Sequence, residues 1–191
     1  GGAGTTDFAA AANWSPAAVP CDGAWVTILA ADGGSATVVL PANHPVSMGK
    51  LTLGASGGTI KFIANSPIAV TGFTEIKSGT TLVLNYYVSP NIVSNDFVIR
   101  SGGKLTHDQL KKLNLSVVGN MTVESGGYVD ADSMGCAPGQ APPGITKSSA
   151  TASGTYGGHP NAAHPCYGSV FNPTDWGCGG GNTKYGGGVV M

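Results

Sequence analysis

Four cysteines are the residues of this chain with the most evident chemistry. They are Cys21, Cys136, Cys166 and Cys178, and no two have Cys-X-X-Cys spacing, so a redox or zinc-ribbon motif is unsupported. An even number of cysteines is typical of a secreted chain with disulfides. We expect a Cys166–Cys178 bond to close a glycine-rich loop and Cys21 to pair with Cys136; the other two connectivities stay open.

The remaining candidate ligands are sparse. Prolines beside His159 and His164 exclude a regular helical ligand face with Cys166 or Asp175, so no zinc site is expected. Asp130 and Asp132 could bind Ca²⁺, but two carboxylates are fewer than the roughly six to eight oxygens that this ion takes. Ten acidic and nine basic residues form no paired-carboxylate or Lys/Arg cluster. We therefore expect no enzyme and no cofactor, with Ca²⁺ as the one open possibility.

Several positions could carry glycans. Asn13, Asn114 and Asn120 each begin an Asn-X-Ser/Thr sequon. A Ser/Thr-rich stretch with prolines over residues 141–155 resembles an O-glycosylated segment. Its candidate positions are Ser148, Ser149 and Thr151. Glycosylation would explain how a chain with few charges stays in solution.

The composition excludes several classes of protein. Charged residues make up 10% of the chain, against about 25% in typical domains. The nine Lys and Arg are dispersed and the net charge is −1, whereas nucleic acids and anionic lipids require concentrated positive charge. No apolar run approaches the roughly 18 residues of a membrane span. Hydrophobic residues at 41% still suffice for a packed core.

Short apolar or alternating runs punctuated by Gly, Ser, Asn and Pro predict an all-β fold. The runs are Trp25–Ile28, Thr37–Leu40, Lys50–Leu53, Thr59–Ile63, Ile68–Val70, Thr80–Leu84, Phe97–Arg100, Leu113–Val117 and Met121–Glu124. Only residues 107–113 could form a helical turn.

A repeated tripeptide indicates how these strands are arranged. Ser-Gly-Gly begins at Ser56, Ser101 and Ser125, at intervals of 45 and 24 residues that correspond to two coils and one coil of a solenoid. The prediction is a parallel β-helix with a long glycine-rich excursion. The alternative is a β-sandwich or jelly roll.

The order of these motifs resembles secreted G8-like and adhesin-type β-helix domains. The opening Asn13-Trp14-Ser15-Pro16 and the coil Met48–Leu53 are similar to the start of such domains, and residues 97–130 resemble successive rungs. The glycine-rich stretch from residue 156 to 188 is similar to the excursion after which their helix resumes. The resemblance implies an extracellular, surface or adhesive role.

We expect four regions: an extended segment 1–12, an all-β core 13–132, a disulfide-closed excursion 133–186 and a terminal strand 187–191. Phe8, or Val189 with Met191, is expected to anchor a strand donated to the next copy. The functional hypothesis is a structural subunit of an extracellular, glycosylated filament or surface layer, whose partners are further copies of itself and covalent glycans. A carbohydrate-binding or adhesin module of a larger surface protein is the alternative.

Overall fold

A computed structural model describes residues 6–30, 33–55, 57–86, 90–145, 155–156, 166–169, 171–180 and 183–191. The chain divides into two compact units. The solenoid unit comprises Gly1–Thr106 and Asn114–Asp130, and the glycine-rich unit comprises His107–Leu113 and Ala131–Met191.

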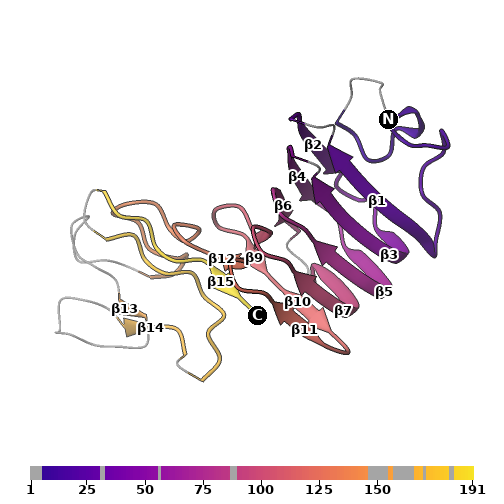
Figure 1. The fold of residues 1–191 in the computed structure, drawn as a ribbon. Coiled ribbons are helices and arrows are strands. Elements are labelled where there is room, and N and C mark those ends of the chain that lie inside the picture. The colour runs from indigo at the N-terminus through magenta and orange to yellow at the C-terminus, as the bar shows by residue number, and fades with distance from the viewer. Residues whose placement is uncertain are drawn as a thin grey trace. The chain divides into compact units, whose positions relative to one another are not determined.

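The solenoid unit consists of two parallel sheets whose strands alternate along the chain through about four turns (Figure 1). The first sheet contains β1 (Ala24–Ala30), β3 (Val46–Ala55), β5 (Ile68–Ile76), β7 (Ile92–Ile99), β10 (Leu115–Val117) and β11 (Met121–Val123). The second contains β2 (Ser35–Leu40), β4 (Thr59–Ala64), β6 (Thr80–Leu84), β8 (Lys104–Thr106) and β12 (Tyr128–Asp130). Each predicted strand from residue 25 to 84 lies within one of these strands, and the predicted strand Phe97–Arg100 ends one residue after β7. The parallel ladders exclude the antiparallel sandwich.

One glycine with a left-handed backbone marks the same corner of each turn. Gly33, Gly57, Gly79, Gly102 and Gly126 have φ between 69° and 83°, a conformation that L side chains rarely adopt. Three of them belong to the Ser-Gly-Gly tripeptides, so the predicted coil spacing is confirmed. The corner between Gly57 and Gly102 is formed by Gly79, so the 45-residue interval between the first two tripeptides spans two turns.

The long strands of the first sheet bend within each turn. The pairing of β3 with β5 shifts at Met48–Lys50, and that of β5 with β7 shifts between Val70 and Phe73. In the last turn the bend becomes a break, because β10 and β11 pair with different halves of β7. Each turn therefore presents two segments of the first sheet and one strand of the second.

The helical turn expected over residues 107–113 is wrong. Leu110 has a φ of 59°, which right-handed helix does not allow, and its amide donates to the carbonyl of Met134 at 2.9 Å. The segment ends in β9 (Lys112–Leu113), which pairs in parallel with β15 (Val189–Val190).

The rest of the glycine-rich unit is held mainly by backbone contacts. A second short ladder joins β13 (Thr155–Tyr156) to β14 (Cys166–Tyr167). The segments around Gly135, Gly177 and Gly186 hydrogen-bond to one another in all three combinations, with N···O distances of 2.8–3.0 Å. Three strands of a flat sheet cannot all pair mutually, so these segments form a triangular bundle.

Glycine is required inside this bundle. A Cβ on Gly186 would overlap the carbonyl of Gly177, and a Cβ on Gly135 would lie 2.7 Å from the Gly177 oxygen. Real Cβ atoms essentially never show contacts under 3.0 Å. Backbone packing that excludes side chains resembles the crowded axis of collagen, where only glycine fits.

Candidate functional site

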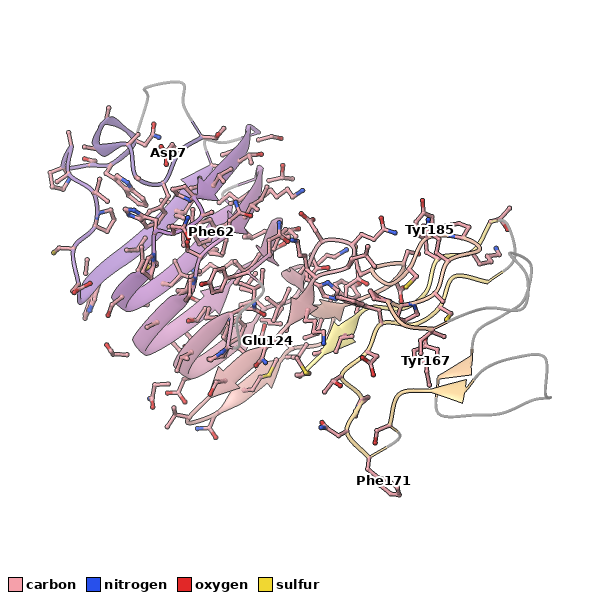
Figure 2. All side chains as sticks on the ribbon, turned by 180° about the vertical axis from the view of Figure 1, so that it is seen from behind. Asp7, Phe62, Glu124, Tyr167, Phe171 and Tyr185 are labelled. Atoms are coloured by element: carbon pink, nitrogen blue, oxygen red, sulfur yellow. The ribbon has the colours of Figure 1, made fainter. Side chains whose placement is uncertain are left out.

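At the N-terminal end of the solenoid, the edge strand β2 of the second sheet is covered by the chain's own first residues. The amide of Phe8 donates to the carbonyl of Val39 at 2.8 Å, and the Phe8 ring is fully buried. The ring packs on Phe62 with centroids 5.9 Å apart and on Trp14 at 4.8 Å, edge to face. Figure 2 shows Phe62 among the strands beneath this end and Asp7 at the end itself. The segment predicted to be donated to a neighbour thus pairs within its own chain.

The core rows are open at their other end. Three rows of inward-facing side chains run along the solenoid, one residue per turn, and end at Met121, Val123 and Val129. The rows are Val26–Leu51–Thr74–Phe97–Met121, Ile28–Leu53–Ile76–Ile99–Val123 and Val38–Phe62–Leu82–Leu105–Val129. Met121 is 43% exposed, Val123 44% and Val129 36%, whereas their neighbours one turn earlier are 0% exposed. Apolar side chains of core type are therefore accessible on the last turn.

The first turn offers a free strand edge and exposed apolar side chains. β3 is the sole hydrogen-bonded neighbour of β1 within the part of the chain that the structure describes. Trp25 and Leu29 on the outer face of β1 are 82% and 65% exposed. They lie against Gly49 and Gly54 of the next turn, where the absence of a side chain makes room. A hollow of about 510 Å³ lies beside β1, between Thr27 and Leu29 on one side and Phe8 and Trp14 on the other.

A second hollow follows a row of prolines on the side of the solenoid. Pro45, Pro67 and Pro90 precede strands of three successive turns, and with Tyr86 and Val93 they line a space of about 440 Å³. Its walls are mostly apolar, and Asp22 and Ser47 supply the polar groups at its edge. An aromatic ring beside aliphatic walls suits the stacking of a sugar.

Charged side chains form one ladder across the turns. The Arg100 guanidinium lies 2.8 Å from a Glu75 oxygen and 2.6 Å from a Glu124 oxygen (Glu124 is labelled in Figure 2). The hydrogen bond from Arg100 lowers the pKa of Glu124, and the hydrogen bond to Glu124 raises the pKa of Arg100. The Glu75 and Glu124 carboxylates both bind the Arg100 guanidinium, so neither is free to act as a general acid. The ladder fits a structural ion pair rather than acid–base catalysis.

Cys136 and Cys178 lie on neighbouring segments of the glycine-rich unit. The amide of Cys136 donates to the carbonyl of Gly177 at 3.0 Å. The Tyr167 hydroxyl donates to the carbonyl of Trp176 at 2.7 Å. Burial, followed by a hydrogen bond with Cys178, raises the pKa of Tyr167. The Tyr167 ring therefore lies beside the segment that carries Cys178 (Figure 2).

The expected disulfides are not seen. No disulfide bond is formed at Cys21, Cys136 or Cys178, the cysteines whose side chains the structure describes. The expected Cys21–Cys136 bond is thus absent, and one partner of the expected Cys166–Cys178 bond has a side chain outside the described residues.

The glycan positions differ in access. Asn120 is exposed, in the loop before β11, and Thr122 of its sequon is exposed too. Asn114 is half-buried. Asn13, in the 3₁₀ turn η1 (Ala11–Asn13), donates its side-chain amide to the carbonyl of Asp7 at 2.7 Å. Ser148, Ser149 and Thr151 lie outside the described residues. Asn120 is therefore the most accessible of the three asparagines, which are the predicted sites that the structure describes.

Metal ligation gains no support from the geometry. Among the residues that the structure describes, no group of three or more His, Cys, Asp and Glu could hold an ion. Asp130 forms an ion pair with Lys104, which occupies the carboxylate considered for Ca²⁺. His159 and His164 lie outside the described residues.

The C-terminal residues also pair within their own chain. Val189 is buried in the ladder with β9, and the amide of Met191 donates to the carbonyl of Leu113 at 2.8 Å. No helix in the described ranges is long and apolar enough to cross a membrane.

In comparisons with known proteins, no protein-family model, curated protein or solved structure matches this chain. The solenoid fold is therefore supported by the structure alone, and the resemblance to G8-like and adhesin-type domains stays a hypothesis.

Sequence reasoning missed the open rows. Met121 and Val123 alternate with polar residues like the buried strands before them, and nothing in that local pattern indicates exposure. The available signal was their position in the last predicted turn.

Proposed function

We propose that this chain is a structural subunit that assembles head to tail into an extracellular filament or surface layer. The observation that carries the proposal is the exposure of Met121, Val123 and Val129 at the end of rows that are otherwise buried. Fully burying such a side chain contributes about 1.5–3 kcal/mol, so their exposure leaves part of that stabilisation unrealised. A further layer of β-structure over the last turn would recover it.

The occupant we favour is the first turn of a second copy. Its β1 has a free edge, and the hollow beside it presents Leu29 and Trp14 to Met121 and Val123 among polar side chains such as Asn13. Pairing β11 of one copy with β1 of the next would continue the parallel ladder of the first sheet. The two contacting surfaces differ, so each copy can bind one neighbour at each end, and a rotation between copies that does not close into a ring generates a filament.

This arrangement changes the proposed route of assembly. Phe8 and Val189 already pair within their own chain, so donating either segment would require it to leave a formed site. Contact between two free edges requires no such opening. We therefore propose edge pairing in place of terminal strand donation.

The extracellular setting rests on composition and access. A chain with 10% charged residues would gain solubility from glycans, and the exposed Asn120 is the best placed of the described positions to carry one. The resemblance to secreted G8-like and adhesin-type domains supports the same setting. Intact-mass measurement of chain secreted from eukaryotic cells should show added hexose mass that Asn120→Gln reduces, while a bare polypeptide mass would contradict the glycan proposal.

Sedimentation velocity and electron microscopy of the purified chain test the assembly. Val123→Asp on the last turn and Leu29→Asp on the first should each abolish concentration-dependent polymers, because either places a carboxylate in the apolar contact. Val118→Asp is the matched control, since Val118 is 75% exposed and precedes the open strand. A wild-type chain that stays monomeric at every concentration, or polymers that survive both substitutions, would overturn the proposal.

The proline-lined hollow favours a second candidate, a carbohydrate-binding or adhesin module. Tyr86 supplies an aromatic ring, and Asp22 and Ser47 supply polar groups for sugar hydroxyls. Affinity electrophoresis in gels containing plant, fungal or bacterial polysaccharides would show retardation that Tyr86→Ala removes. Retardation without polymers would favour this function over the filament.

A further inference from the structure

The glycine-rich unit contains two cysteines on adjacent segments that no function proposed above uses. Cys136 is buried, and Cys178 is half-buried. The hydrogen bond from the Cys136 amide to the Gly177 carbonyl, at 3.0 Å, fixes the residue next to Cys178 against Cys136. Cys178 directly follows Gly177, so the backbones that carry the two cysteines are adjacent, as a disulfide with α-carbons about 4.4–6.8 Å apart requires.

The neighbouring residues hold these two segments in place. The amide of Gly186 donates to the Cys136 carbonyl at 2.9 Å, and the amide of Gly177 donates to the Gly187 carbonyl at 2.9 Å. A Cβ on Gly179 would overlap the Ala137 carbonyl, so the two chains are in backbone contact on both sides of Cys178. The two cysteines therefore lie on adjacent, tightly fixed backbones.

The surroundings place both sulfur atoms near one ring. Tyr167 is buried and interacts with Cys178 through a hydrogen bond and with Cys136 electrostatically. The Tyr167 hydroxyl also donates to the Trp176 carbonyl, two residues before Cys178. Both cysteines therefore interact with the same phenol from adjacent segments, which is compatible with a disulfide between them.

We propose that Cys136 and Cys178 form a disulfide under oxidising conditions, a pairing that differs from both bonds expected from the sequence. In the reaction with glutathione disulfide, the Cys178 thiolate attacks one glutathione sulfur and releases one glutathione thiolate. The Cys136 thiolate then attacks the Cys178 sulfur of the mixed disulfide and releases the second glutathione. The protein loses two protons and two electrons, and glutathione disulfide takes up both to become two glutathione thiols.

The positions of the cleavage sites in this sequence allow the disulfide pairing to be assigned by mass spectrometry. Combined cleavage after lysine and arginine and before aspartate yields a separate peptide for each cysteine: Asp7–Cys21, Asp132–Lys147, Ser148–Thr174 and Asp175–Lys184. The full-length chain is equilibrated with glutathione disulfide, and its remaining thiols are then alkylated at low pH. The chain is digested without reductant and the peptides are weighed by mass spectrometry.

The expected product is Asp132–Lys147 linked to Asp175–Lys184, with a mass two hydrogens below the sum of the separate peptides. Cys178→Ser should abolish this product, while Cys166→Ser and Cys21→Ser should leave its yield within twofold of the unsubstituted chain. A link from Asp132–Lys147 to Ser148–Thr174 or to Asp7–Cys21 would overturn the pairing, as would alkylation of Cys136 and Cys178 alongside full oxidation of a control dithiol. The outcome is independent of the filament proposal, which sedimentation tests.

Discussion

The solenoid unit and the glycine-rich unit exclude water by opposite means. In the solenoid, rows of side chains such as Ile28–Leu53–Ile76–Ile99 fill the space between two sheets. In the glycine-rich unit, the backbones at Gly135, Gly177 and Gly186 approach so closely that no side chain fits between them. Truncating a buried side chain should therefore destabilise the solenoid unit. Adding one methyl group to a glycine should destabilise the glycine-rich unit.

The largest loss should follow removal of the Phe8 ring. Phe8→Ala should lower the free energy of unfolding by about 3–5 kcal/mol, the usual cost of a cavity left by a buried phenylalanine. Urea denaturation measures this loss, and Phe171→Ala is the matched control because Phe171 is 96% exposed. A loss that appears only at high protein concentration would instead mean that Phe8 belongs to a neighbouring copy.

The converse substitution tests the glycine-rich unit. Gly186→Ala should cost about 1–3 kcal/mol, because its methyl group must displace the Gly177 carbonyl and break the triangular bundle. Gly187→Ala is the control within the same segment, since a Cβ there meets no atom within 4 Å. Thermal unfolding that shifts equally for both variants would contradict the close backbone packing.

A smaller loss should follow truncation at the exposed end of one solenoid row. Phe97→Ala should carry the full cost of a core cavity, whereas Met121→Ala, one turn later, should cost below about 1 kcal/mol in dilute solution because Met121 is already half exposed. If copies assemble, the cost of Met121→Ala should rise with protein concentration. Equal costs for the two variants at low concentration would mean that the last turn is covered.

The smallest effect concerns the charge ladder. Arg100→Gln should raise the pKa of Glu124 towards its ordinary value, because the hydrogen bond from Arg100 is what lowers it. A lowered pKa contributes stability above the ordinary carboxyl pKa, and that stability is lost as pH falls through the lowered value. Carbon-detected NMR titration of the Glu124 carboxyl measures the change, with Lys61→Gln as the control. An unchanged midpoint would exclude the ion pair in solution.

The sequence predicted the solenoid well because the coil leaves two local signals. Alternating runs identify the strands, and Gly57, Gly102 and Gly126 recur where the corner requires a left-handed backbone. The corner at Gly79 lacks the second glycine of the motif, which is why the tripeptide skips one turn.

The candidate surfaces were harder to predict because they depend on what a strand meets in space. The segment around Phe8 was expected to be extended, whereas Asp7 forms one bridge and a turn and η1 follow it. No local pattern specifies whether such a segment pairs with its own chain or with another. Cys136 and Cys178 are adjacent because of backbone hydrogen bonds across a long loop, which spacing along the chain does not encode.

The corner glycines also mark the stretch of sequence that a gene duplication could repeat. Successive corners lie 22 to 24 residues apart, and each turn contacts mainly the turns before and after it. Duplicating one such stretch of the gene would lengthen the solenoid by about 4.8 Å, one strand spacing, and leave the surfaces at both of its ends intact. Related chains could therefore differ in length by whole turns while keeping the same first turn, with Phe8 beside it, and the same exposed last turn.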